Sequence, residues 1–362
     1  MSRITQLRGA LRRVANELEL EKSTQRGRNL LRMVANGKAA VGQTPADLVH
    51  KENKWRLLRY RSPNGRRYKT PIFLVPSLIN RHYVLDLAPG RSFAEFLVNQ
   101  GHDVFIIDWG KPSDEDRYLT FEDITDRYLG RALQRVNEYA PSGRSHVLGY
   151  CLGGTLSVIH AAAYPERFAS LLTLAAPVAF DVDGILNNWM RLESFDVNAL
   201  VEGIGNVPWP LMQLAFHLIR PTLNLSKAVH LVDRAWDDEF LDGFLALESW
   251  GNDNVSFPGE AYRRYIEDLY RDDKLIKDEL TLGGKPAKLS NIDCPAMVIT
   301  FEHDNIVPGP SASPLVERIA SKDKQHIHLP GGHVGAVVSR KASTGLWPGM
   351  STWWSERDGA SS

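Results

Sequence analysis

A short box of glycines around a cysteine constrains the fold of this chain more than any other segment. The box reads Gly149-Tyr150-Cys151-Leu152-Gly153-Gly154, with a strand-like run before it and a helix-like run after it. The pattern G-x-C-x-G between a strand and a helix is a nucleophile elbow in which cysteine replaces the usual serine. Strand and helix pass close to the central residue of such a turn, so only glycine fits at positions 149 and 153. The turn also places the sulfur near a helix N-terminus, whose dipole favours the reactive thiolate. The alternative interpretation is a buried structural cysteine in a tight turn.

Strands and helices alternate through the first half of the chain. Strand-like segments occupy 54–60, 71–76, 104–108, 145–148 and 171–175, and helix-like segments occupy 121–139 and 155–163. This alternation predicts an α/β fold with a mostly parallel, doubly wound sheet. The alternation stops near Pro177, and strand-like segments return at 294–300 and 326–329. The residues between are mainly helical and rich in aromatic side chains, namely Trp189, Trp209, Trp236, Trp250, Tyr262, Tyr265 and Tyr270.

An insertion of this size between two core strands predicts a helical cap over a site at the carboxyl ends of the strands. The expected division is a helical segment at 1–45, a core of 46–177 and 290–354, a cap of 178–289 and a frayed tail at 355–362. The cap aromatics are expected to form hydrophobic core, with substrate lining, a dimer contact or a contact with a larger particle as the alternatives.

Candidate partners for the cysteine follow two later strands, in the order nucleophile, acid, histidine. Asp304 is the expected acid, and Glu302 is the second choice because it still belongs to the end of the strand. His333 is the expected general base, since it lies on a glycine-rich loop just past a strand. The nearby His303, His326 and His328 are expected to be ordinary surface or core residues.

An oxyanion hole would need two backbone N–H donors near the cysteine. The first is expected from Leu152, the residue after the nucleophile, and the second from the loop that follows the strand at 71–76. Pro76 has no N–H, which leaves Leu78 or Ile79, and the sequence does not choose between them.

Composition excludes several classes of protein. The chain has 362 residues, with 43 Lys+Arg against 43 Asp+Glu, and such neutrality argues against a nucleic-acid binder. Its 2 cysteines cannot make a disulfide scaffold or a multi-cysteine zinc site, and no spacing of metal ligands stands out. The N-terminus lacks the apolar stretch of a signal peptide, and the longest apolar run, 171–180, is about half of the roughly 20 residues that a membrane span needs. These features predict a cytoplasmic protein without a membrane span.

The first residues predict a helix with one apolar face, formed by Ile4, Leu7, Leu11, Val14 and Leu18. This face either packs on the protein's own domain or meets a partner subunit or a lipid-like particle.

Several motifs together resemble the polyhydroxyalkanoate synthases, the polyester polymerases of the α/β-hydrolase superfamily. The matching segments are 44–49 with 52–54, 75–81 leading into 85–87, 108–110, 149–154, 258–260, 289–292, Asp304 with 307–308, and 332–334. The length of the chain and the cap sequences at 247–250 and 262–265 resemble those of the short catalytic subunits of classes III and IV, which work with a second, non-catalytic subunit. Two positions depart from the family pattern: Asn305 stands where histidine is usual, and Leu152 stands where class III often has glutamine.

The resemblance implies an α/β-hydrolase fold with a large cap and a triad of Cys151, Asp304 and His333. It implies polymerisation of (R)-3-hydroxyacyl-coenzyme A, with a short acyl chain such as 3-hydroxybutyryl, through an acyl-cysteine. It also implies coenzyme A thioester as substrate with no permanently bound cofactor, a second subunit, homodimerisation, and a cytoplasmic location at polyester granules. Either His333 or Asp304 would activate the attacking hydroxyl.

Two rival functions stay open at this point. The first is a cysteine-dependent hydrolase or a small acyltransferase on the same fold. The second is a non-catalytic scaffold that binds granules, against which the complete set of Cys151, Asp304 and His333 argues.

Overall fold

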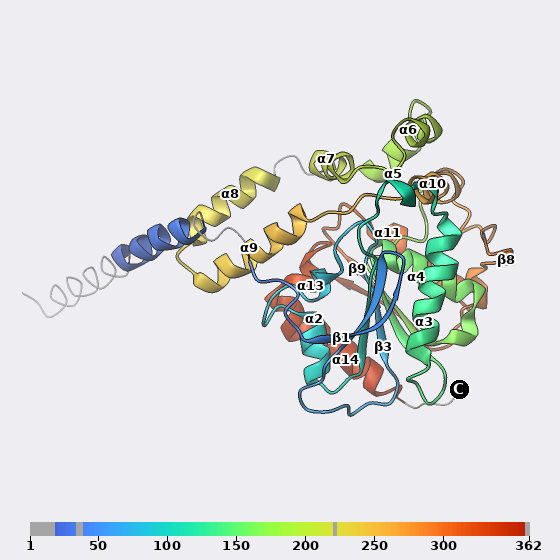
Figure 1. Cartoon of the computed structure of the whole chain (residues 1–362), viewed down its shortest axis with the longest axis horizontal. Coiled ribbons are helices and arrows are strands. Elements are labelled where there is room, and N and C mark those ends of the chain that lie inside the picture. Colours follow the sequence, from blue (N-terminus) through green and yellow to red (C-terminus); the bar gives the residue numbers. More distant parts are fainter. Residues whose placement is uncertain (1–18, 34–38, 220–222, 359–362) are drawn as a thin grey trace, which may run out of the picture. The chain divides into compact units, whose positions relative to one another are not determined.

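Figure 1 shows a computed structural model of the chain, which describes residues 19–33, 39–219 and 223–358. The chain divides into two compact units. The helical unit comprises residues 1–41 and 220–252, and the core unit comprises residues 42–219 and 253–362. Each unit is described by itself below.

A mostly parallel sheet forms the centre of the core unit. Within the described residues, eight strands lie in the order β1-β2-β4-β3-β5-β6-β9-β10. The two pairs at one edge, β1 with β2 and β2 with β4, are antiparallel, and all other neighbours are parallel. The strands are β1 (Ala46–Glu52), β2 (Trp55–Tyr60), β3 (Ile72–Val75), β4 (Val104–Asp108), β5 (Ser145–Tyr150), β6 (Phe168–Leu174), β9 (Ala296–Phe301) and β10 (Lys324–Leu329). A separate hairpin pairs β7 (Thr281–Leu282) with β8 (Lys285–Pro286). The predicted doubly wound α/β sheet is confirmed.

The inner strands read as apolar runs because both of their faces are covered. Every residue of β3, β4, β5 and β9 is buried. Figure 1 shows α3 (Leu129–Asn137) and α4 (Leu152–Ala163) over one face and α2 (Phe93–Asn99) and α14 (Trp347–Ser355) over the other. Continuous apolar strands are the pattern of parallel sheets that carry helices on both sides.

The remaining helices of the core unit lie in the cap and at the C-terminal end. They are α5 (Ile185–Met190), α6 (Val197–Ile204), α7 (Trp209–Ile219), α10 (Gly259–Arg264), α11 (Gly309–Ala312), α12 (Leu315–Arg318) and α13 (Gly335–Val338). Short 3-10 or π-helical segments are η1 (His82–Leu85), η2 (Asp114–Tyr118), η3 (Asp123–Tyr128), η4 (Pro165–Arg167), η5 (Tyr265–Arg271), η6 (Leu289–Asn291) and η7 (Ala342–Leu346).

The cap enters the core between β6 and β9. These strands are neighbours in the sheet, with Leu171 opposite Ala296, so the long segment between them is an insertion. Part of this segment, residues 220–252, groups with the N-terminal residues in the helical unit. The boundaries 1–45, 46–177, 178–289 and 290–354 stay predictions.

The helical unit contains a helix at 19–33, α8 (Leu223–Arg234) and α9 (Asp238–Asn252). Asn29, in the helix at 19–33, contacts the turn after α8 and the start of α9. Its Nδ2–H donates to the Ala235 carbonyl at 2.8 Å and to Asp238 Oδ1 at 2.7 Å. The apolar face expected on Ile4, Leu7, Leu11, Val14 and Leu18 lies outside the described residues. Its two alternative roles therefore stay open.

The predicted frayed tail is wrong for the residues just after α14. Asp358 accepts hydrogen bonds from the backbone N–H groups of Lys69 and Thr70 at 2.9 and 2.8 Å, and Arg357 pairs with Asp323 at 2.8 Å. The helix before these residues is itself anchored in the core, since Phe93 of α2 packs on Trp347 and Trp354.

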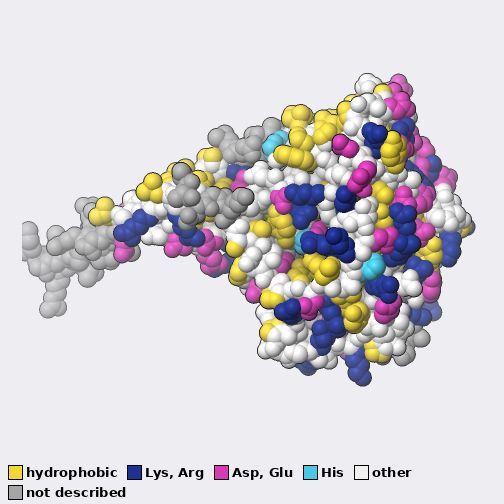
Figure 2. Space-filling view, in the orientation of Figure 1, with side chains coloured by type: hydrophobic (Ala, Val, Ile, Leu, Met, Phe, Trp, Pro, Cys, Tyr) yellow, Lys and Arg dark blue, Asp and Glu magenta, His cyan; other side chains and the backbone are white. Residues whose placement is uncertain are grey.

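None of the helices in the described part of the chain combines the length and apolar composition that crossing a membrane requires. On the face of the core unit shown in Figure 2, Lys and Arg side chains alternate with Asp and Glu side chains. The two signs of charge are mixed on this face, as expected for a chain of zero formal net charge, so the face carries no large patch of one sign.

Candidate active site

Cys151 occupies the sharp turn between β5 and α4. Its backbone has φ 54° and ψ −132°, a conformation that non-glycine residues rarely adopt. A Cβ at Gly149 would lie 2.3 Å from the Gly154 Cα, and a Cβ at Gly153 would lie 2.2 Å from the Val75 carbonyl oxygen. The glycine box is therefore a steric requirement of the close strand–helix crossing.

The structure brings Asp304 and His333 together at the carboxyl ends of β9 and β10. His333 Nδ1 lies 2.7 Å from Asp304 Oδ2, and both side chains are buried. The other carboxylate oxygen, Oδ1, accepts the backbone N–H groups of Ile306 and Val307 at 2.9 and 2.8 Å. Asp304 is thus held on one side by its own loop and presents the other side to the imidazole.

The other candidate side chains near Asp304 and His333, two on the loop after β9 and two on β10, have different surroundings. Glu302 and His303 are exposed. His326 and His328 both share the Thr300 hydroxyl, each at 2.8 Å, on β10. Of the acid candidates, only Asp304 makes the 2.7 Å contact with His333 among the described residues.

The surroundings of His333 favour its protonated form. Burial by itself would lower the pKa of His333, but the negative charges of a Cys151 thiolate and of Asp304, with hydrogen bonds to both side chains, raise that pKa to about 10. A raised pKa favours the protonated imidazole next to Cys151, and a histidine beside the sulfur is the partner that a cysteine nucleophile requires.

Tyr150 supports the histidine loop, and the sequence reasoning missed this role. Its hydroxyl donates to the His333 carbonyl at 3.3 Å, and the centres of the two rings lie 5.3 Å apart. Gly332 lets the loop approach, because a Cβ there would lie 3.3 Å from the His303 carbonyl. No local pattern in the sequence marked this role, because Tyr150 and His333 lie 183 residues apart in the chain.

An apolar cavity of about 310 Å³ opens beside Cys151. The cap supplies most of its wall through Leu186, Met190, Phe195, Leu200, Val207, Leu211, Met212, Ala215, Phe216, Phe257, Tyr262, Tyr265, Ile266 and Tyr270, and the core supplies Ile79, Leu152, Pro177, Ile306 and Val307. Burial raises the pKa of Tyr262 to about 12, so its hydroxyl stays neutral. Three of the aromatic residues singled out in the sequence, Tyr262, Tyr265 and Tyr270, are both buried core and cavity lining.

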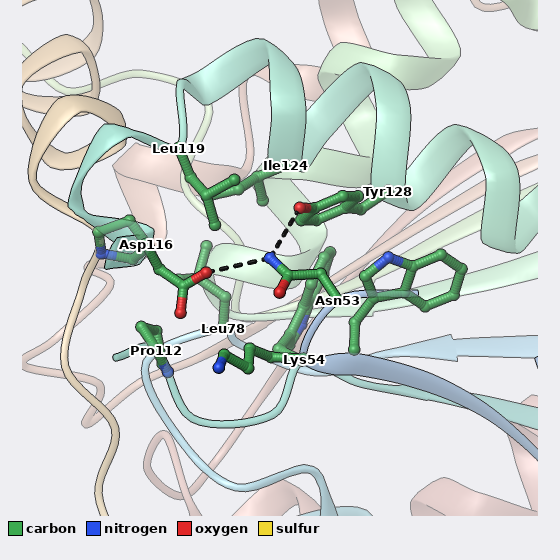
Figure 3. Close-up of a pocket in the computed structure, with 11 residues that line it drawn as sticks. Asn53, Lys54, Leu78, Pro112, Asp116, Leu119, Ile124 and Tyr128 are labelled. Atoms are coloured by element: carbon green, nitrogen blue, oxygen red, sulfur yellow. Dashed lines mark hydrogen bonds between the residues drawn. The ribbon is translucent and has the colours of Figure 1, made fainter. Parts of the chain in front are cut away.

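Ile79 and Leu78, the two candidate oxyanion donors after β3, line different cavities. Ile79 lines the Cys151 cavity together with Leu152. Leu78 lines a separate cavity of about 30 Å³, shown in Figure 3, beside the Asn53 side chain that bonds Asp116 and Tyr128. Ile79 therefore borders the Cys151 cavity and Leu78 does not, and the identity of the second donor stays a prediction.

The second cysteine is more buried than the first. Cys294 is buried, and burial raises the pKa of its thiol to about 12. Cys151 is partly exposed at the cavity. In the residues that the structure describes, no group of three or more His, Cys, Asp or Glu side chains could hold a metal ion.

Two family models match the chain. The model described as "Poly-beta-hydroxybutyrate polymerase (PhaC) N-terminus" matches residues 7–97, and the model described as "alpha/beta hydrolase fold" matches residues 70–338. The second match spans the strands from β3 to β10, the cap and all three residues of the candidate triad.

Solved structures with the same fold include a monoglyceride lipase from Saccharomyces cerevisiae and an alpha/beta hydrolase fold protein from Nakamurella multipartita. The lipase has a TM-score of 0.53 at 13% identity and covers 88% of this chain and 98% of its own. The Nakamurella protein has a TM-score of 0.50 at 18% identity and covers 88% of this chain and 100% of its own. At these identities the likeness shows the fold alone.

Three sequence relatives have the name "Poly(3-hydroxyalkanoate) polymerase subunit PhaC". The protein from Haloferax mediterranei is 38% identical, over 88% of this chain and 65% of its own length, so the chain spans about two thirds of that relative. The protein from Thiocystis violacea is 31% identical over 95% of this chain and 97% of its own. The protein from Synechocystis sp. is 33% identical over 88% of this chain and 86% of its own. With the hydrolase sheet, the cysteine elbow and the adjoining Asp304–His333 pair in place, these matches show that the chain belongs to the PhaC family of poly(3-hydroxyalkanoate) polymerases.

Proposed function

We propose that this protein polymerises (R)-3-hydroxyacyl-coenzyme A into polyester and releases coenzyme A, through an acyl group carried on Cys151. The observation that carries the proposal is the position of Cys151 in the wall of an apolar cavity, with the Asp304–His333 pair adjoining it, in a chain of the PhaC family. Coenzyme A thioester is the substrate in this scheme, and no resident cofactor takes part.

The first half-reaction loads the enzyme. His333 takes the thiol proton of Cys151, and the sulfur attacks the thioester carbonyl. The bond from that carbonyl to the coenzyme A sulfur breaks, and the imidazolium returns its proton to the leaving thiolate. The backbone N–H groups of Leu152 and Ile79 would bind the oxyanion of the tetrahedral intermediate, since both residues border the same cavity as the sulfur.

The second half-reaction makes the ester bond. A 3-hydroxyl group attacks the acyl carbonyl on Cys151 as a base removes its proton. The carbonyl–sulfur bond breaks, Cys151 recovers its proton, and the chain is longer by one unit. His333 is the base that the geometry favours, because Asp304 already uses both carboxylate oxygens in hydrogen bonds to His333 and to its own loop.

Cysteine suits polymerisation better than serine would. Exchange of one thioester for another changes the free energy little, so the acyl group stays activated for ester formation. Water competes with the 3-hydroxyl for that acyl group, and the apolar walls supplied by Met190, Phe257 and Tyr265 lower the access of water to it. A cavity of about 310 Å³ suits short acyl groups such as 3-hydroxybutyryl.

Incubation with (R)-3-hydroxybutyryl-coenzyme A tests the proposal. We expect release of free thiol together with insoluble polyester, and neither product from Cys151→Ala. Free 3-hydroxybutyrate in proportion to coenzyme A, without polymer, would identify a hydrolase instead. If Cys151→Ala still released coenzyme A, the proposed acyl-cysteine intermediate would be contradicted.

We also propose, from the family resemblance, that the protein works in the cytoplasm at the granule surface, as a homodimer and with a second, non-catalytic subunit. The N-terminal helical segment at 1–45 is the expected contact for partner or granule. Deletion of residues 1–40 should weaken that association more than it lowers the stability of the core unit, as measured by co-sedimentation with granules and by urea denaturation. Equal association of the deleted and intact chains would contradict this.

A further inference from the structure

The segment that carries Ile79 into the Cys151 cavity is held on one side by the sheet. This segment, residues 76–86, is called here the Ile79 segment. Trp109, which directly follows β4, donates its Nε1–H to the Pro76 carbonyl at 2.9 Å. The start of the segment is therefore fixed by a residue of the core.

The other side of the Ile79 segment is held by consecutive residues that follow α9. The Val255 N–H donates to the Ile79 carbonyl at 3.3 Å. The Asn80 side chain donates to Asn254 Oδ1 at 2.9 Å. The chain leaving α9 thus runs along the segment that borders the cavity, with a main-chain bond at Ile79 itself.

Asp253 is the charged centre of these contacts. The Tyr83 hydroxyl donates to its Oδ2 at 2.8 Å, Lys111 Nζ donates to its Oδ1 at 2.5 Å, and Arg81 Nε lies 3.5 Å from Oδ2. Tyr83 and Arg81 belong to the Ile79 segment, whereas Lys111 belongs to the loop after β4. One carboxylate therefore joins the loops that follow two neighbouring strands of the sheet.

The strength of these contacts follows from their chemistry. Hydrogen bonds to an ionised carboxylate are about twice as strong as neutral ones. The Asp253 side chain is one-third exposed and that of Arg81 is mostly covered, so solvent screens the cluster only in part. Loss of the charge would weaken the contacts that Arg81 and Tyr83 make with this side chain, directly beside Ile79.

We propose that Asp253 is a positioning residue for thioester cleavage: it holds the Ile79 segment where the Ile79 N–H can bind the oxyanion formed at Cys151. The inference rests on the proposed function for the identity of the reaction. Asp253 touches neither substrate nor sulfur and acts through Arg81 and Tyr83. Because the oxyanion exists only in the transition state and the intermediate, a misplaced donor slows the chemical step and leaves ground-state binding nearly unchanged.

The test compares Asp253→Asn with Asp278→Asn in the full-length chain. Asp278 is a matched control, since it is similarly exposed and bonds one arginine, Arg318, and one backbone N–H, that of Leu289. Steady-state release of coenzyme A from (R)-3-hydroxybutyryl-coenzyme A gives kcat and KM, and urea denaturation gives stability. We expect Asp253→Asn to lower kcat about tenfold or more, less than the 10²–10³-fold cost of removing one oxyanion donor outright. KM should stay within about twofold, and Asp278→Asn should keep the kcat of the wild type.

Tyr83→Phe provides a second test in case Asp253→Asn does not fold. Tyr83→Phe removes one hydrogen bond to Asp253 and keeps the ring, and it should lower kcat in the same direction by a smaller factor. In the double variant the two losses should not multiply, because they act through one contact.

Three results would overturn the inference: an unchanged kcat in both single variants, a raised KM at constant kcat, or an equal loss of kcat in Asp278→Asn. The assay follows thioester cleavage, which occurs whether the acyl group goes to polyester or to water. Failure of the proposed function would appear in the wild-type products, as hydroxy acid without polymer. Failure of the inference would appear only in the kcat values of the variants.

Discussion

Asp304 and His333 meet through a single carboxylate oxygen, Oδ2, which lies 2.7 Å from the imidazole Nδ1. The other oxygen is occupied by two backbone N–H groups of the same loop. The carboxylate therefore cannot rotate away from the imidazole without breaking bonds to its own backbone. This contact fixes both the tautomer and the direction of the ring, so that Nε2 is the nitrogen available to the sulfur.

Replacement of Asp304 should damage catalysis far more than replacement of Glu302. In Asp304→Asn the side-chain amide presents the wrong partner to His333 Nδ1, and we expect the rate of coenzyme A release to fall at least about a hundredfold. Glu302→Gln should retain most of the activity because Glu302 is exposed. The measurement is kcat/KM for both purified variants, and comparable losses in the two would contradict the assignment of the acid.

The elbow should not accept even one additional carbon at Gly153. In Gly153→Ala the new Cβ would meet the Val75 and Pro76 carbonyl oxygens at 2.2 and 2.4 Å, so the strand, the helix or the Ile79 segment must shift. We expect a loss of about 2 kcal/mol or more in the free energy of unfolding, together with loss of activity. Gly349→Ala is the matched control, since it lies in α14 with open space at its Cβ and should be neutral or stabilising. Urea denaturation of both variants checks this, and equal midpoints would refute it.

Alkylation should distinguish the two cysteines. Iodoacetamide at neutral pH should modify Cys151, which borders the cavity, and leave Cys294 unmodified, because burial excludes the reagent and raises the pKa of the Cys294 thiol to about 12. Peptide mass spectrometry locates the label, and unfolding in urea should expose both sites. Labelling of Cys294 in the folded protein at the rate of Cys151 would be inconsistent with the structure.

Stability should decrease as the pH rises above neutrality, in part through His333. The pKa of His333 is raised from 6.5 to about 10, so its protonated form stabilises the fold fully below about pH 6.5, and this contribution is lost as the pH rises toward 10. We expect the urea midpoint of the wild type to fall between pH 7 and pH 10, and to fall less in His333→Gln. Parallel pH profiles for the two proteins would show that His333 does not carry this dependence.

Local patterns sufficed for much of the core unit. The apolar runs at β3, β4 and β9 and the helix after Cys151 can be read from the sequence because each depends on residues close together in the chain. β1 was missed because its exposed, charged residues lie at the edge of the sheet, where a strand need not be apolar. The order of the tail after α14 was missed because it depends on Asp358 meeting the backbone near Lys69, at the opposite end of the chain.

The sequence by itself determined the nucleophile elbow, the doubly wound sheet, the insertion after β6 and the residue types at the site. These follow from local steric rules at Gly149 and Gly153 and from strand ends that all face one edge of a parallel sheet. Only the tertiary structure decided which acid meets His333, that Ile79 and not Leu78 borders the cavity, that Tyr150 holds the histidine loop, and that Asp253 clamps the Ile79 segment. The physical reason is distance along the chain: each of these contacts joins segments brought together only by strand pairing and cap packing, and no local pattern encodes such a meeting.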